Sequence, residues 1–141
     1  MRIFISGLLF ILLANVSAFG ATLKSEGAAE ALSEEVMLAL QNDDISGAFE
    51  KMKLYMDISD NNFEASTAKS IARHNEFKQR FGKTIGYEFI GGKMVGTSLL
   101  RLQYLEKKDN YALRWSFYYF KTSKGWRLNT FSWEGDIKSF F

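Results

Sequence analysis

The sequence predicts an α+β fold, in which N-terminal helices pack on a curved antiparallel sheet of about four strands. Two observations lead to this prediction. Apolar residues recur at three- and four-residue steps through much of residues 26–81, a spacing typical of amphipathic helices. Beyond residue 82 the period changes to two, and aromatic-rich segments at 99–106, 111–120 and 126–134 follow one another across short polar turns. That pattern is typical of an antiparallel meander.

Three helices are expected before the sheet. The first begins near residue 26, the second runs from 45 to about 57, and the third covers about 63–81. Gly82 ends the third helix, because glycine tolerates the backbone geometry of a helix C-cap. The residues expected to face inward are Ala29, Leu32, Val36, Leu40, Ile45, Ala48, Phe49, Met52, Tyr55, Ala68, Ile71 and Ala72. His74 is expected on the polar face of the third helix.

The strand pattern also predicts a register. A two-residue turn at Asp109-Asn110 places Tyr104 opposite Trp115 and Leu102 opposite Phe117. A second tight turn, near residues 122–125, is expected to bring Tyr119 near Trp126 and Phe117 near Leu128. One face then collects a core: Leu100, Leu102, Tyr104, Leu113, Trp115, Phe117, Tyr119, Trp126 and Leu128.

The opposite face of the predicted sheet mixes arginines with aromatic residues, a composition typical of protein–protein contacts. Its candidate interface residues are Arg101, Arg114, Tyr118, Arg127, Phe131 and Trp133. We expect a homodimer through this face, with ordinary solvent exposure and ligand contact as the alternatives.

Residues 1–20 have the layout of a cleaved signal peptide, with Arg2, an apolar run and small residues before the expected cleavage site. The apolar run is too short for a membrane anchor, which needs roughly 20 residues, so no stable anchor is expected after cleavage. The chain has no cysteine, and its only glycosylation sequon, at Asn15, lies inside this segment. Both features favour a periplasmic or secreted bacterial protein.

Residues 21–141 are predicted to form a single domain, since no linker or repeat interrupts them. Charge divides unevenly along this domain. Residues 22–64 hold ten acidic residues against three lysines, whereas residues 65–141 hold 14 basic residues against six acidic ones. The basic residues are dispersed rather than clustered, which disfavours nucleic acid as a partner.

Few residues suggest catalysis. His74 is the only histidine, and Glu88 is the carboxylate best placed to face a cavity, so these two are weak catalytic candidates. No catalytic residue is assigned on this basis. Glu106 and Glu134 lie at strand ends and are expected to be solvated. With no cysteine and one histidine, the sequence predicts no metal site and no cofactor.

The order of helices and strands, ending in Gly125-Trp126-Arg127 and an apolar tail at Ile137, Phe140 and Phe141, resembles the NTF2-like superfamily (cystatin-like α+β fold). The resemblance covers nearly all of residues 26–141. It implies a cone-shaped sheet with a pocket at its open end, and dimerisation through the outer face of the sheet. The superfamily includes enzymes as well as small exported proteins, so the fold alone does not define a function.

Two functions remain open at this level. The favoured one is an exported non-catalytic module that binds a small apolar or anionic ligand or a protein partner. The expected lining of its cone is Tyr55, Tyr87, Tyr104 and Trp115. The alternative is a small periplasmic isomerase, dehydratase or hydrolase that uses Glu88 or His74 with a pocket tyrosine.

Overall fold

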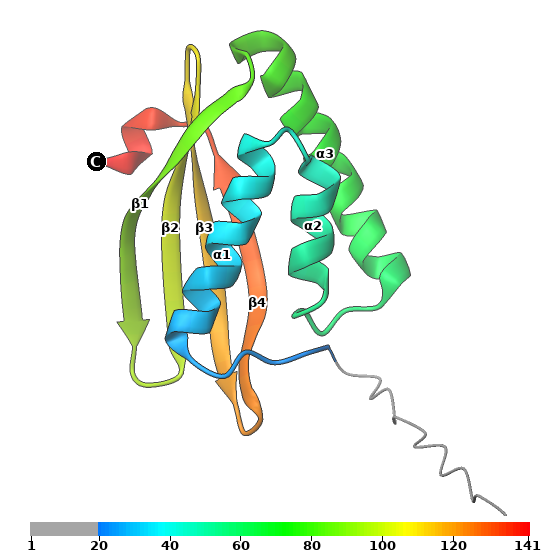
Figure 1. Ribbon diagram of the computed structural model, residues 1–141, viewed down its shortest axis with the longest axis vertical. Helices are drawn as coiled ribbons and strands as arrows, with labels where there is room; N and C mark the ends of the chain where they lie inside the picture. The colour runs from blue at the N-terminus through cyan, green and yellow to red at the C-terminus, as the bar shows by residue number, and fades with distance from the viewer. Residues whose placement is uncertain (1–19) are drawn as a thin grey trace, which may run out of the picture.

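The computed structural model describes residues 20–141 and confirms the α+β class. Three helices precede a four-stranded antiparallel sheet and lie together on one of its faces (Figure 1). The predicted signal peptide, except Gly20, lies outside the described residues.

The helices are α1 (Glu26–Gln41), α2 (Ile45–Lys53) and α3 (Asp60–Phe81). Each begins after a polar residue whose side chain accepts a backbone N–H of the first turn, which stabilises the helix start. These N-cap residues are Ser25, Asp44 and Ser59. Gly82 follows α3 with φ 91°, as expected for a residue type that adopts positive φ without strain.

The strands are β1 (Thr84–Val95), β2 (Leu99–Lys108), β3 (Ala112–Thr122) and β4 (Gly125–Glu134). They pair in chain order, as a meander. The predicted register between β2 and β3 is confirmed, with Tyr104 opposite Trp115 and Leu102 opposite Phe117. β1 contains a register shift between Phe89 and Gly91, an irregularity typical of a β-bulge.

The predicted register between β3 and β4 is wrong. Tyr119 lies opposite Leu128, and Trp126 lies opposite Lys121. The pairing of β3 with β4 also contains a register shift. Tyr119 pairs with Leu128 and Tyr118 with Thr130, so Asn129 is an additional residue in β4. An additional residue reverses the alternation of faces beyond it, so the end of β4 presents different side chains to the helices than a regular strand would.

The core lies between the sheet and the helices. All nine predicted sheet core residues are buried, and so is the predicted apolar stripe of α1. On α2, Ala48, Phe49 and Met52 are buried and Ile45 is partly buried. On α3 the prediction holds only for Ile71, which is partly buried against the core; Ala68 and Ala72 are exposed, and the buried residues are Phe63, Thr67 and His74. This helix packs at the β4 end of the sheet (Figure 1), and therefore faces polar partners as well as apolar ones.

Segments outside the helix layer protect the edge and the outer face of the sheet. Leu23 forms a β-bridge with Trp126 at the free edge of β4. After β4 the chain crosses behind the sheet, and the short helix η1 (Ile137–Phe140) lies on the face away from α1–α3 (Figure 1). The rest of that outer face is not covered by any helix of the described chain.

Candidate functional site

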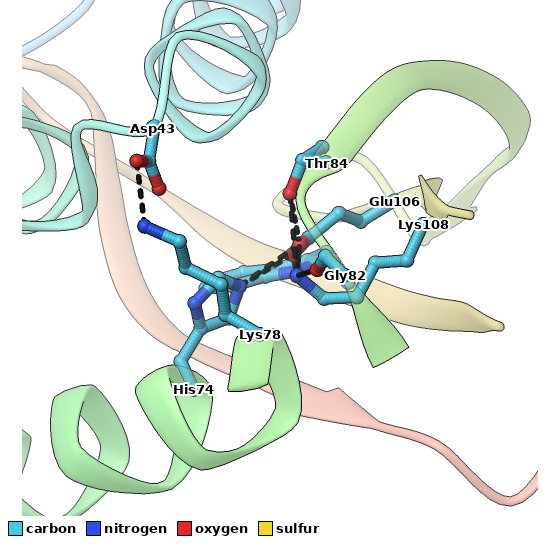
Figure 2. Close-up of polar contacts among 8 residues, drawn as sticks. Asp43, His74, Lys78, Gly82, Thr84, Glu106 and Lys108 are labelled. Carbon is cyan, nitrogen blue, oxygen red and sulfur yellow. Dashed lines mark hydrogen bonds and ion pairs between the residues drawn. The ribbon is translucent and has the colours of Figure 1, made fainter. Parts of the chain in front are cut away.

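A buried ionic network joins α3 to β2. His74 Nε2 lies 2.7 Å and 2.9 Å from the two carboxylate oxygens of Glu106. Trp115 Nε1 donates a third hydrogen bond to the same carboxylate at 3.0 Å, and the Thr84 hydroxyl a fourth at 3.0 Å. Figure 2 shows the histidine ring and the threonine hydroxyl turned toward Glu106. Because an ionised carboxylate only accepts hydrogen bonds, Nε2 of His74 carries a proton.

Lys108 completes the network. Its Nζ atom lies 3.5 Å from Glu106, and it donates hydrogen bonds to the carbonyl of Gly82 and to the Thr84 hydroxyl. Burial on its own raises the pKa of Glu106. The hydrogen bond and charge of His74, the charge of Lys108 and the hydrogen bond from Trp115 outweigh burial and hold this pKa below its ordinary value. The carboxylate is therefore ionised at neutral pH.

The network does not have the access that catalysis requires. The side chains of His74 and Glu106 are 6% and 0% exposed. A general acid or base must come within hydrogen-bond reach of its substrate. His74 was expected on a polar face and Glu106 in solvent; both expectations are wrong, because each supplies the buried partner of the other. The geometry indicates a structural role.

The sequence contained a signal for this network. Glu106 and Lys108 continue the inward alternation of Leu102 and Tyr104 along β2. An in-phase charged residue on a core face needs a buried partner, and the only histidine was available to provide one. The expectation of a solvated Glu106 rested instead on its position at a strand end, where side chains are usually exposed.

Glu88 is placed differently. Its carboxylate accepts a hydrogen bond from Lys107 Nζ at 3.0 Å, and both side chains are about half exposed, at 55% and 42%. This is an ion pair at the surface, on the outer face of the sheet opposite Leu105. Glu88 does not face the interior between sheet and helices.

The four residues that were expected to line a pocket in the cone belong largely to the hydrophobic core. Tyr104 and Trp115 are completely buried, and Phe49 from α2 packs edge-on against Trp115 with ring centroids 6.3 Å apart. Tyr87 packs against Tyr104, and Tyr55 is partly buried against the same core. Aromatic packing fills the space that was expected to hold a ligand, so Tyr104 and Trp115 are not at a pocket.

The expected interface set divides into three groups. Phe131 and Trp133 were expected on the outer face, and this placement is wrong: the additional residue in β4 turns them toward the helices. Trp133 is 7% exposed and donates a hydrogen bond to the Ser70 hydroxyl at 2.7 Å, while Phe131 packs edge-on against Phe49.

Two arginines of the set have partners within the chain. Arg114 pairs with Glu134, donates to the carbonyl of Ser139 and lies over the Phe140 ring. Arg114 therefore holds η1 against the outer face. Arg127 pairs with Asp57 at 3.3 Å and donates to the carbonyl of Gly20, around the edge of β4.

Arg101 and Tyr118 remain on the open part of the outer face. With Lys93 and Thr130 they form one row across the four strands, and Val95, Leu99, Phe120 and Arg127 form the next row. A hollow of about 200 Å³ opens here, which we call the outer-face hollow. Its lining residues are Lys93, Val95, Leu99, Leu100, Arg101, Tyr118 and Tyr119.

The two cations of the outer-face hollow are not neutralised internally. Within residues 20–141, neither Lys93 nor Arg101 forms an ion pair, and Nε of Arg101 is buried without a hydrogen-bond partner. The carboxylates that lie on the outer face, Glu88 and Glu134, are paired with Lys107 and Arg114 instead. The hollow therefore combines apolar walls with positive charge.

Among the residues described, no three histidines or carboxylates gather in a way that could hold a metal ion. None of the described helices has the length and apolar character needed to cross a membrane. A scan against models of protein families gives no match for this sequence, and a search of the curated proteins gives none either.

Proposed function

We propose that this chain is an exported, non-catalytic binding module of the NTF2-like superfamily, and that it binds a small anionic ligand with an apolar body in the outer-face hollow. The observation that carries the proposal is the part of the outer face that η1 leaves open, where two cations without an ion-pair partner among residues 20–141 border exposed apolar side chains. The order of helices and antiparallel strands supports the superfamily assignment.

The chemistry of the hollow defines the ligand class. Lys93 and Arg101 attract a carboxylate or another anion, and the arginine provides a planar set of donors for it. Val95 and Leu99 are 57% and 46% exposed and provide an apolar surface beside these cations. The hollow is smaller than the roughly 300–1,000 Å³ of drug-sized sites, so it suits a short chain.

Titration with octanoate tests the proposal directly. Amide shifts in an NMR spectrum should change saturably on β2 and β3 around Arg101 and Tyr118. Octylammonium, which has the same chain and the opposite charge, should cause no such change. The substitution Arg101→Gln should weaken octanoate binding about tenfold or more, since it removes a charge-assisted contact. Arg80→Gln, the same change on the exposed end of α3, should leave binding unaltered.

A second copy of the chain is the alternative occupant of the outer face. A face-to-face dimer would bring two cationic surfaces together, and like charges in an interface cost free energy. The unpaired Lys93 and Arg101 therefore favour an anionic ligand over self-association. Sedimentation equilibrium decides between the two: a stable dimer that Leu99→Lys dissociates would overturn the ligand proposal.

Catalysis is the less supported function class. The two weak catalytic candidates both have partners: His74 is buried in a network with Glu106, and Glu88 forms an ion pair at the surface. Turnover of an octanoyl ester that Glu88→Gln abolishes would favour a hydrolase. Octanoate binding that this variant leaves unchanged, without turnover, supports a binding module.

Export is part of the proposal and has its own test. The basic and apolar pattern of residues 1–20 supports it. Mass spectrometry of protein recovered from the periplasmic fraction should give a mass that lacks this segment. Recovery of the complete chain in the cytoplasm would contradict export without affecting the octanoate result.

A further inference from the structure

A polar groove lies between α3 and the end of β4, on a different part of the molecule from the outer-face hollow. We call it the α3–β4 groove; its volume is about 340 Å³. It is lined by Ser66, Lys69, Ser70, Arg73, Phe131, Ser132 and Trp133. Among residues 20–141, no acidic side chain takes part in this lining.

One face of α3 provides the polar wall. Ser66, Lys69, Ser70 and Arg73 follow one another at three- and four-residue intervals, which places them side by side along the helix. In residues 20–141, neither cation pairs with a carboxylate. The groove therefore presents two positive charges together with several hydroxyl groups.

Arg73 is held in place by aromatic rings. Its guanidinium carbon lies 4.7 Å from the centre of the Trp133 ring and 5.6 Å from that of Phe77. Stacking on a ring face orients the planar guanidinium and leaves its edge N–H groups able to donate to an oxyanion. Trp133 is itself fixed, because its indole N–H donates to the Ser70 hydroxyl at 2.7 Å.

Ser70 adds a donor to this arrangement. Its oxygen accepts from Trp133, so its own proton can be donated to a bound group. Arg73, Lys69 and Ser70 together offer donors from three different side chains along the groove. A tetrahedral oxyanion, which has three or more acceptor oxygens, matches this donor set.

We propose that the α3–β4 groove binds a tetrahedral oxyanion of the phosphate class, held by Arg73 and Lys69 and oriented by Ser70. Phe131 and Trp133 border the same groove, so an organic phosphate can place its apolar part against them. The site does not depend on the outer-face hollow, and it is present whether or not octanoate binds there.

NMR titrations at low ionic strength test the site with inorganic phosphate, phenyl phosphate and benzoate. Phosphate should shift the amides of Ser66, Ser70 and Arg73 and the indole N–H of Trp133 saturably. Tighter binding of phenyl phosphate identifies an organic ester as the source, and equal binding identifies free phosphate. Benzoate binding as tight as phosphate overturns the tetrahedral class, and no saturable shift with any phosphate overturns the site.

Matched variants separate the site from general surface charge. Arg73→Gln should raise the dissociation constant about tenfold or more, and Arg73→Lys should recover part of the loss, because it restores the charge without the planar fork. Lys69→Gln, at an exposed position, tests the second cation without disturbing packing. Lys83→Gln removes an exposed charge outside the groove and should change nothing. Equal losses in the Arg73 and Lys83 variants would overturn the proposal.

Discussion

His74 Nε2 donates to Glu106 Oε1 across 2.7 Å, from a helix to a strand separated by 32 positions in the chain. Both side chains lie between α3 and the sheet and are almost completely buried. Glu106 is also buried beside the ammonium group of Lys108, 3.5 Å away. A buried ion pair contributes little net stability when complete, but removing one partner leaves an uncompensated charge. The packing of α3 onto the sheet is therefore sensitive to substitution of Glu106.

The substitution Glu106→Gln should destabilise the protein by about 3–5 kcal/mol, the range for breaking a buried pair. It leaves Lys108 buried without a counter-charge and weakens the contact with His74. Urea denaturation measures the free energy of unfolding. Glu88→Gln, which alters an exposed ion pair, is the control and should change stability within about 0.5 kcal/mol. Similar effects of the two variants would contradict a structural role for the network.

The stability contributed by Glu106 should depend on pH. Its pKa is lower in the folded protein than the ordinary value of 4.5, so folding favours the ionised form. This contribution is complete above pH 4.5 and is lost as the pH falls through the lower folded-state pKa. The difference in unfolding free energy between the natural chain and Glu106→Gln should therefore narrow in acid. Urea titrations at a series of pH values measure it, and a constant difference from neutral to strongly acidic pH would contradict the sign.

Two buried tyrosines should respond in opposite ways to loss of their hydroxyl groups. The Tyr119 hydroxyl lies 2.7 Å from that of Ser33, so Tyr119→Phe should cost about 1 kcal/mol. The Tyr104 hydroxyl has no hydrogen-bond partner within the described chain, and Tyr104→Phe should leave stability unchanged or raise it. Thermal unfolding compares the two variants. A larger loss for Tyr104→Phe would mean that its hydroxyl has a partner.

Two aromatic residues that the strand pattern predicts on the outer face should also differ in their contribution to stability. Trp133 packs among α3 side chains, so Trp133→Ala should cost about 3–5 kcal/mol. Tyr118 is 36% exposed, and Tyr118→Ala should cost no more than about 1 kcal/mol. Calorimetric unfolding of the two variants measures the contrast. Equal and small effects of the two substitutions would contradict the register shift at Asn129 and would indicate that β4 alternates regularly to its end.

The local sequence pattern was sufficient to predict much of the fold. The alternation of Leu102, Tyr104, Trp115 and Phe117 predicted both the β2–β3 register and the buried face, because a slip by one residue would expose every one of them. The candidate site was less predictable. Of the six expected interface residues, Arg101 and Tyr118 line the outer-face hollow. Nothing local shows that Arg127 reaches Asp57 or that Arg114 holds η1.

The sequence alone therefore determined the class of the fold, the order of its elements and the inward faces of β2, β3 and the start of β4, because periodicity and turn residues act over a few positions. Tertiary structure decided the rest. One additional residue at Asn129 reversed the end of β4, and a polar residue such as Glu106 became buried only because His74, Thr84 and Trp115 meet it from distant segments. Burial of a charge depends on partners that folding assembles, and no local spacing encodes where those partners will lie.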